Sequence, residues 1–465
     1  MSIPASTQSS FSKLSLVKWI VALGIPALIC LIPVNDLFTW RIRLFIALSL
    51  LLILLVAFEL FNIMVPSVLL PTAYFVTGIV PASTAFGAWT GTVIWVVLGA
   101  FVLANVLEDV GLLKRIAYWC ILKTGGTYAG TVWGTLIASI VLSVVTFGNA
   151  YVLMAALSYG ICKALGLGKS KEAAIIMTAG LLGVVTVRGV IYAPTVLSLI
   201  NAGAQLVLPD FQITWLNELI DNLPVLLFCF LFVWVMLKTL KKKPDTNGRA
   251  YFQQEYDALG PFSTNEKKSC AVLVVLLLYL CTGTLHGLPM DYGFMIIPWL
   301  LFMPKIDVGT DKNLKDLDLS MLMFIVACMS IGTVASALGI GKIVSDILAP
   351  ILGTLPTSIV LFSMMFMGII LNLLMTPLAI LAGFSEPVTQ IALSLGISPR
   401  AMLYALNYSC DLIILPYEYV PYLIFFSFGL MHTSDFIKYM GLKVILFCVF
   451  FFIAIIPYWH LLGLV

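Results

Sequence analysis

Two asparagines interrupt long apolar stretches of the chain and are the first candidates for binding chemistry. Asn149 follows Gly148 within SVVTFGNA (143–150), and Asn372 lies within ILNLLMTP (370–377). An asparagine side chain carries both a hydrogen-bond donor and an acceptor, so a pair of them could hold a polar solute. A lone asparagine inside a membrane usually bonds to a neighbouring helix. One at a matching break in each half of the chain instead favours a binding site.

Two threonines lie beside these asparagines and could add hydroxyl groups to the same site. They are Thr146 and Thr376. A threonine in a helix can equally bond to a carbonyl of its own helix, so both interpretations stay open. We take Thr376 as a candidate substrate ligand and Thr146 as a candidate for ion coupling.

Arg188 is a cation near the middle of a long apolar segment, 172–206. A guanidinium inside a bilayer is costly unless it is paired or solvated, and such residues are functional candidates. Its planar fork suits a carboxylate, which indicates an anion as the ligand. Glu418 is the alternative partner, because it lies beside Pro421 in the second half as Arg188 lies near Pro194 in the first. A substrate contact and a structural ion pair are both open.

Glu418 and Asp411 are also candidates for ion coupling. Asp411 lies about two helical turns before Glu418. A fixed cation in the site could replace a bound sodium ion, and a buried carboxyl could carry a coupling proton because burial disfavours its charged form. These residues predict proton-coupled transport or exchange, with sodium as the less favoured coupling ion and no other cofactor.

The elements that must position these residues follow from composition. The chain has 465 residues, of which 61% are hydrophobic and 10% charged. Soluble proteins carry about 25% charged residues, and a membrane-spanning helix needs about 20 mostly apolar residues. Lipid offers no hydrogen-bond partners, so the spans must be helices or a closed barrel, and continuous apolar runs indicate helices. We predict an all-α integral membrane protein with the lipid bilayer as its main partner.

Composition also argues against several functions. A net charge of +3 does not indicate a nucleic-acid partner. The nine cysteines are scattered singly and the three histidines lie far apart, so no metal site is expected. The chain contains no HExxH, GxSxG or cofactor-binding loop, which argues against an enzyme. The first apolar run, after Lys18, lacks a small-residue cleavage site and is expected to be a retained helix.

About eleven apolar segments are long enough to cross a membrane. Six precede a basic loop and five follow it: 17–34, 43–62, 64–80, 88–108, 172–206 and 223–240, then 269–285, 290–304, 319–340, 401–430 and 441–462. The loop, 241–268, begins with three lysines, and positive charge marks the cytoplasmic side. The order of segments then places the N-terminus in the cytoplasm and the C-terminus outside a cytoplasmic (inner) membrane.

Two further apolar stretches, 128–165 and 353–382, are too long for one span and are interrupted by the asparagine segments. Two half-helices that meet at such a break form a re-entrant hairpin, which is tolerated only inside protein or beside a wet cavity. Matching broken segments in two halves indicate a transport site between inverted repeats. The predicted parts are an N-terminal segment with the first helix (1–36), a first repeat (37–240), the cytoplasmic loop (241–268) and a second repeat (269–465).

Three motifs occur in an order typical of one family of membrane transporters: VIWVVLGAFVL (93–103), LEDVGL (107–112) and GPFS (260–263). They are similar to the fourth helix, its amphipathic extension and the start of the second half in the divalent anion/sodium symporter family. The chain resembles that family in order and spacing over roughly residues 40–465.

The resemblance implies a binding site at two hairpin tips and two broken helices. The family carries Ser-Asn-Thr at each tip, and this chain keeps Asn149 and Asn372 without the flanking hydroxyls. The broken helices of the family carry a Thr-Pro-Pro-Asn-like run, of which one proline is kept in each half: Pro194, followed by Thr195, and Pro421. The lost residues bind sodium and carboxylate in the family, so the resemblance does not extend to those ligands.

The resemblance further implies a secondary transporter of a small organic anion, of the di- or tricarboxylate class, that works by an elevator motion as a homodimer. A different solute, such as sulfate or an uncharged molecule, and a non-transporting membrane protein are the alternatives. The candidate substrate-binding residues are Gly148, Asn149, Arg188, Pro194, Thr195, Asn372, Thr376 and Pro421, and the candidate coupling residues are Thr146, Asp411 and Glu418.

Overall fold

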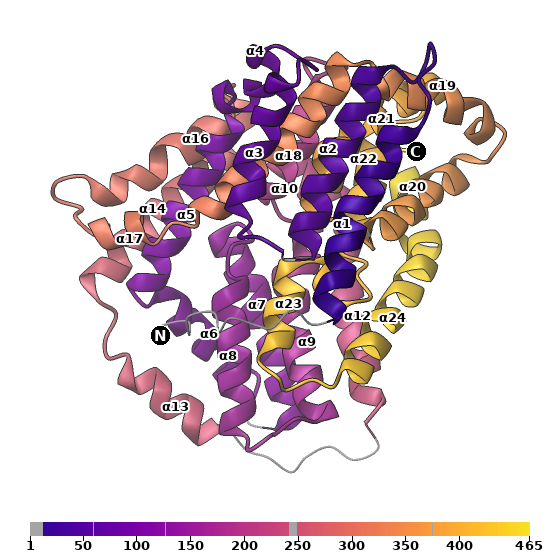
Figure 1. The fold of residues 1–465 in the computed structure, drawn as a ribbon. Coiled ribbons are helices and arrows are strands. Elements are labelled where there is room, and N and C mark those ends of the chain that lie inside the picture. The colour runs from indigo at the N-terminus through magenta and orange to yellow at the C-terminus, as the bar shows by residue number, and fades with distance from the viewer. Residues whose placement is uncertain (1–12, 59, 126, 241–248, 374) are drawn as a thin grey trace.

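The computed structural model describes residues 13–58, 60–125, 127–240, 249–373 and 375–465. Within these residues every regular element is a helix, as the composition predicts (Figure 1). The helices up to residue 240 are α1 (Lys13–Leu31), α2 (Trp40–Ala57), α3 (Met64–Val76), α4 (Ala82–Ala85), α5 (Val93–Asp109), α6 (Leu112–Lys123), α7 (Tyr128–Thr146), α8 (Tyr151–Ala164), α9 (Lys171–Val185), α10 (Pro194–Gln205), α11 (Trp215–Asp221) and α12 (Pro224–Lys238).

The remaining helices lie after residue 248. They are α13 (Arg249–Ala258), α14 (Thr264–Cys281), α15 (Gly283–His286), α16 (Asp291–Ile296), α17 (Asp311–Lys315), α18 (Leu319–Ala337), α19 (Ile340–Leu352), α20 (Thr357–Asn372), α21 (Pro377–Leu395), α22 (Pro399–Ser409), α23 (Val420–Ser427), α24 (Thr433–Phe450) and α25 (Ile456–Leu461). A π-helical segment, Phe451–Ile455, joins α24 to α25, and short 3₁₀ turns cover Gly87–Thr90, Thr186–Gly189, Ile297–Phe302 and Pro416–Glu418.

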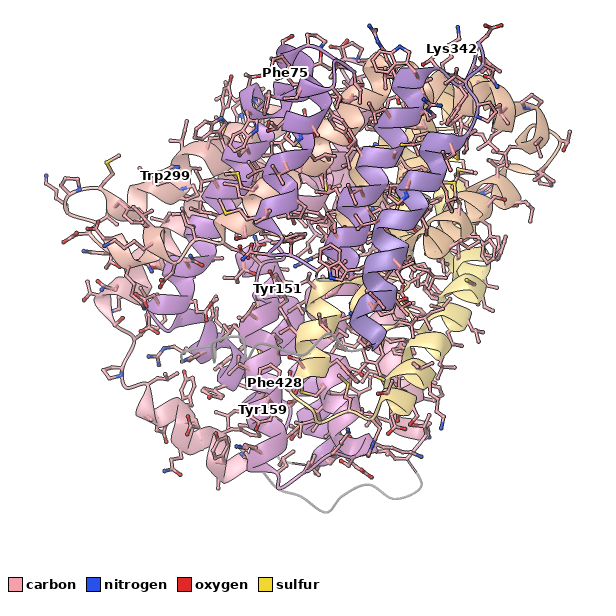
Figure 2. All side chains as sticks on the ribbon, in the orientation of Figure 1. Phe75, Tyr151, Tyr159, Trp299, Lys342 and Phe428 are labelled. Carbon is pink, nitrogen blue, oxygen red and sulfur yellow. The ribbon has the colours of Figure 1, made fainter. Side chains whose placement is uncertain are left out.

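Several of these helices are long and apolar enough to cross a membrane. In the described part of the chain there are five by length and composition: Tyr128–Thr146, Lys171–Gln205, Leu319–Ala337, Pro377–Leu395 and Thr433–Leu461. There are up to seven if each of two bent pairs, α5 with α6 and α11 with α12, is one span. Long apolar side chains stand outward over much of the surface, as lipid contact requires (Figure 2). The number of about eleven spans stays a prediction.

Helix breaks occur at both of the predicted hairpin tips. After α7 the chain turns through Phe147 (φ 52°) and Gly148 (φ 85°), and this left-handed backbone ends the helix before α8 begins. In the second half α20 ends at Asn372, and α21 begins at Pro377 with Thr376 in the N-cap position. The second pair extends to Leu395, beyond the predicted limit of 382. A re-entrant path of either pair stays a prediction.

Each of the two helix pairs, α7 with α8 and α20 with α21, contacts helices from both halves of the chain. Both α7 and α8 pack against α9, and both α20 and α21 pack against α22. In addition α8 contacts α23 and α21 contacts α10, so each pair also touches the later segment of the other half's broken helix (Figure 1). Tyr159 and Phe428 mark the first of these contacts, with ring centroids 5.0 Å apart (Figure 2). The breaks in both halves are therefore brought to the centre of the molecule.

Small residues allow these helices to approach closely. A Cβ atom on Gly183 in α9 would lie 1.8 Å from Oγ of Ser139 in α7. A Cβ atom on Gly368 in α20 would lie 1.9 Å from Oγ of Ser409 in α22. Both contacts join the first helix of a pair to the following broken helix, which is the kind of small-residue contact that holds membrane helices together.

Two left-handed glycines produce matching corners. Gly111 (φ 84°) separates α5 from α6, and Gly339 (φ 71°) separates α18 from α19.

The predicted cytoplasmic loop is more ordered than the sequence indicated. Its residues 241–248 lie outside the described residues, as do residues 1–12 of the N-terminal segment, but α13 is a helix that packs against α6.

We predict that Gly183→Val destabilises the protein. The side chain would overlap Ser139, and overpacking of this kind costs about 1–3 kcal/mol. Thermal unfolding of the detergent-purified protein measures the effect. Gly160→Ala in α8 is the matched control, because no atom lies within 4 Å of the added Cβ and alanine favours a helix over glycine. Equal melting temperatures for both variants would contradict the close contact of α7 and α9.

Candidate functional site

The two broken helices supply the irregular backbone at the centre of the molecule. In the first half the 3₁₀ turn Thr186–Gly189 follows α9, and Pro194 is the first residue of α10. In the second half residues 410–419 separate α22 from α23, and Pro421 lies in the first turn of α23. A proline at the start of a helix costs nothing because its missing N–H would have no partner there, so each proline fixes where the helix resumes. Thr195 follows Pro194 and is buried.

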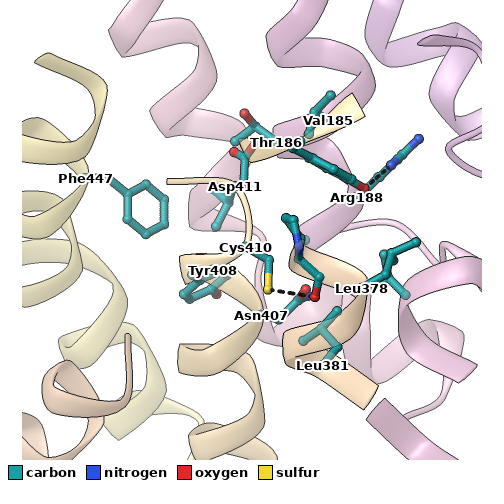
Figure 3. Close-up of a pocket in the computed structure, with 15 residues that line it drawn as sticks. Val185, Thr186, Arg188, Leu378, Leu381, Asn407, Tyr408, Cys410, Asp411 and Phe447 are labelled. Atoms are coloured by element: carbon teal, nitrogen blue, oxygen red, sulfur yellow. Dashed lines mark hydrogen bonds between the residues drawn. The ribbon is translucent and has the colours of Figure 1, made fainter. Parts of the chain in front are cut away.

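A small cavity of about 30 Å³ lies between these breaks (Figure 3). Its walls come from the first break, the second break, α21, α12 and α24: Val185, Thr186, Arg188, Gly189, Val196, Val225, Pro377, Leu378, Leu381, Asn407, Tyr408, Cys410, Asp411, Tyr419 and Phe447. Space of this size holds a water molecule or two. Sites for organic ligands commonly measure about 300–1,000 Å³, so the cavity must widen before such a ligand can enter.

Arg188 lies at the edge of this cavity and is only 7% exposed. Its Nε donates to the carbonyl of Gly148 at 3.0 Å, and its Nη2 donates to the same oxygen. Its Nη1 donates to the hydroxyl of Tyr419 at 2.6 Å, and the guanidinium lies 5.4 Å from the ring centroid of Tyr151. Every one of these partners is neutral, so the positive charge is hydrogen-bonded without an ion pair among the described residues.

Glu418 does not pair with Arg188. Its Oε1 accepts hydrogen bonds from the backbone N–H groups of Leu415 (2.7 Å) and Ile414 (3.3 Å). The carboxylate therefore closes the turn before α23, where the chain leaves N–H groups without helical partners. Of the two possibilities open from the sequence, the structural ion pair between Arg188 and Glu418 is not formed.

Asp411 pairs instead with Lys443, a residue that the sequence reasoning missed. Lys443 lies on α24 and is fully buried, and its Nζ is 2.5 Å from Oδ2 of Asp411. The same Nζ donates to the Asp411 carbonyl and to the hydroxyl of Tyr422, both at 2.8 Å. Its sequence signal is weaker than that of Arg188, because Lys443 is the third residue of the apolar segment 441–462 and Arg188 lies near the middle of its segment. Asp411 thus reaches the cavity as half of a compensated pair.

Asn149, Thr146 and Asn372 donate hydrogen bonds to nearby backbone carbonyls at the two tips. Nδ2 of Asn372 donates to the carbonyl of Ser409 at 2.6 Å, which is a helix–helix bond between α20 and α22. Its Oδ1 and the hydroxyl of Thr376 are buried and have no partner among the described residues. Nδ2 of Asn149 and Oγ1 of Thr146 donate to carbonyls of the α7 segment. Acceptor capacity therefore remains at the second tip.

The structure brings together only part of the predicted site. Arg188 and Asp411 line the cavity, and Gly148 joins it through its hydrogen bond with Arg188. Tyr419 and Thr186 line it as well, although neither was predicted as a ligand. The other predicted residues shape the breaks around it. Within the described ranges no group of three or more His, Cys, Asp or Glu side chains could hold a metal ion.

We predict that Lys443→Met is strongly destabilising. It leaves Asp411 as an uncompensated buried charge, a loss that costs about 3–5 kcal/mol. Adding Asp411→Asn should recover much of that loss, because both charges are then absent. Thermal unfolding of the single and double variants measures the coupling. Additive losses would contradict a direct pair.

The fold and the site together define a polytopic helical membrane protein with an irregular, polar centre, which is the architecture of a transporter. A model of the citrate transporter family, CitMHS, matches residues 53–408. The chain belongs to this family and is a secondary transporter of a small solute, as its motifs indicate. The members of its family and its structural relatives are transporters or efflux pumps, not enzymes.

Two solved structures share the fold. The YdaH transporter of Alcanivorax borkumensis is 17% identical, with a TM-score of 0.56 over 82% of this chain and 88% of that one. MtrF of Neisseria gonorrhoeae, described with a class of antimetabolite efflux pumps, is 14% identical, with a TM-score of 0.59 over 93% and 98%. A protein of Cupriavidus necator described as a membrane protein is 25% identical over 240 residues, 50% of this chain and 46% of that relative. The match thus spans about half of that relative's length.

Proposed function

We propose that the transported solute is a small organic anion of the di- or tricarboxylate class and that the membrane is the cytoplasmic (inner) one. The name of the family makes citrate the first substrate to test. The observation that supports an anion is the state of Arg188, which is buried at the cavity with only neutral partners. A buried charge without a counter-ion is unfavourable, and an anion in the cavity would supply that counter-ion.

The other groups at the cavity support the same sign of charge. Asp411 is compensated by Lys443, so this pair contributes no net charge. Arg188 then leaves the site with one positive charge at the place where the two breaks meet. A planar guanidinium can bind a carboxylate with two parallel hydrogen bonds. To do so, Arg188 would release the Gly148 carbonyl, the hydroxyl of Tyr419, or both, as the cavity widens.

The small volume of the cavity supports a transport cycle with a large motion. The two helix pairs and the two broken helices would move as one body against the remaining helices, as the elevator mechanism of the divalent anion/sodium symporters implies. We assign the chain to that group as a divergent member, built as two inverted repeats (37–240 and 269–465) and working as a homodimer. The recurrence of left-handed corners, paired helices and broken helices in both halves supports the repeats.

Coupling by a proton, or by exchange of one anion for another, fits the chain better than sodium. The chain lacks the hydroxyl residues that flank the tip asparagines in the symporter family, and it lacks the asparagine of that family's broken helices. A fixed cation lies at the cavity instead. In this proposal Asn149, Asn372, Thr376, Pro194, Thr195 and Pro421 shape the substrate site around Arg188. Thr146, Asp411 and Glu418 are the coupling candidates from the sequence.

An uncharged solute is the second candidate substrate. Most of the cavity wall is apolar, including Val185, Val196, Leu378, Leu381 and Phe447. A solute that uses this apolar surface would not require the charge of Arg188. Sulfate, which is an anion without apolar surface, is a further alternative.

We predict that Arg188→Gln lowers the affinity for the anion by about ten- to a hundredfold, because a hydrogen bond to a charged group contributes about 1.5–3 kcal/mol. The measurement is uptake of radiolabelled citrate, succinate and malate by reconstituted proteoliposomes. Proton and sodium gradients are varied independently. Arg188→Lys should lose less affinity, since it keeps the charge but not the planar fork.

Arg41→Gln is the control, because Arg41 is exposed and lies on α2, away from the cavity. It should transport like the wild type. Unchanged uptake in a well-folded Arg188→Gln protein would remove the basis for an anionic substrate. Uptake driven by sodium alone would keep the substrate and discard proton coupling.

A further inference from the structure

Glu218 is the most isolated charged group in the described part of the chain. It lies on α11, its exposed fraction is 0%, and neither of its carboxyl oxygens has a hydrogen-bond partner among the described residues. The segment is part of the bent pair formed by α11 and α12. An ionised carboxylate in such a place is strongly unfavourable, so this carboxyl is stable there only when it is neutralised.

Arg400 lies in the same region, but it already pairs with another acid. Asp221, one turn further along α11, pairs with Arg400 at 3.1 Å and accepts a hydrogen bond from Tyr404 at 3.0 Å. Glu218 interacts electrostatically with Asp221, and as a like charge Asp221 makes an ionised Glu218 still less favourable. Among the described residues of this cluster there are two acids, Glu218 and Asp221, and one basic residue, Arg400, which pairs with Asp221.

The remaining groups around Glu218 are neutral. They are the phenols of Tyr404 and Tyr408 on α22 and of Tyr192 at the first break, while Tyr458 on α25 faces Asp221. The carbonyl of Glu218 accepts from Nδ2 of Asn222, and Oδ1 of Asn222 accepts from the hydroxyl of Tyr408. A proton needs one carboxyl oxygen and no extra space, whereas metal cations such as calcium require several oxygen ligands.

These contacts connect Glu218 to the cavity. Tyr408 bonds to Asn222 beside Glu218 and also lines the cavity, as does Asp411 in the break that follows α22 (Figure 3). On the other side of the cluster, the Arg400 side chain is 33% exposed at the surface of the molecule. The cluster therefore lies between solvent and the cavity, on a helix that belongs to the second break.

We propose that Glu218 is the proton-binding site that couples transport, in place of Glu418 or Asp411, an inference that rests on the proposed function. Glu218 takes a proton from water on one side of the membrane and returns it to water on the other side. With the proton bound, the carboxyl is neutral, α11 and α22 remain packed, and the positive charge of Arg188 is available to the anion. Without it, the charged carboxylate must reach water, which requires α22 to move. Glu418 and Asp411 are less suited, because their oxygens already accept hydrogen bonds.

The test separates proton-driven uptake from exchange. Glu218→Gln imitates the protonated carboxyl, so we expect citrate accumulation driven by a pH gradient to fall roughly 5- to 150-fold. Exchange of external for internal citrate without a gradient should persist and lose its dependence on pH. Glu386→Gln is the matched control, a buried carboxyl on α21 that is bonded to Gln390, and it should accumulate citrate like the wild type.

Several results would overturn the proposal. Full pH-driven accumulation by Glu218→Gln is one, and loss of coupling in Glu418→Gln but not in Glu218→Gln is another. Uptake that depends on sodium and not on pH also excludes a proton site. A wild-type protein that carries none of citrate, succinate and malate would refute the proposed function. Infrared difference spectra then still decide the site, because a protonated carboxyl band of the purified protein must vanish in Glu218→Gln; a band unchanged in this variant would overturn the assignment.

Discussion

The buried guanidinium of Arg188 constrains the whole centre of the molecule. It cannot reach bulk water, and the described chain offers it no carboxylate, so its N–H groups must find neutral oxygens at short range. The oxygens available are the carbonyl of Gly148, freed by the left-handed turn after α7, and the hydroxyl of Tyr419 at the second break. The side chain of Arg188, in the turn that follows α9, thus joins the tip between α7 and α8 to the broken helix of the second half. The position of each of these elements depends on the other two.

The packing around this centre joins elements from both halves of the chain. α8 contacts α23 and α21 contacts α10, so one helix of each pair is held by an element from the other half. Close contacts at Gly183 and Gly368 keep the paired helices in register with the broken ones. In the proposed elevator motion, these elements would move together against the helices outside them. The cavity between the breaks measures about 30 Å³ in this arrangement, with Arg188 bonded to Gly148 and Tyr419.

Local chemistry made part of this predictable from the sequence. Pro194 and Pro421 mark where helices resume, and Asn149 and Asn372 mark the two interruptions, because each effect acts within a few residues. Partner choice was not predictable in the same way. Symmetry suggested Glu418 for Arg188, yet the nearest unsatisfied groups to Glu418 are its own N–H groups. Lys443 is the third residue of the apolar segment 441–462, where a lysine usually extends to the membrane surface. Glu218 lies between the segments 172–206 and 223–240. Only tertiary structure shows the burial of either residue.

The ionisable groups at the centre form two compensated pairs, while Arg188, Glu218 and Glu418 have no charged partner among the described residues. Glu418 accepts hydrogen bonds from backbone N–H groups of its own turn. Asp411 with Lys443 and Asp221 with Arg400 are neutral as pairs. Arg188 and Glu218 remain, and both adjoin the cavity helix α22, the first through the cavity and the second through Tyr408. In the proposed mechanism a proton on Glu218 removes its negative charge, so the positive charge of Arg188 favours an anion. Without the proton, the carboxylate reduces that attraction. In this mechanism, binding of the proton and binding of the anion would each favour the other, and the two affinities would change by the same factor because linkage is reciprocal.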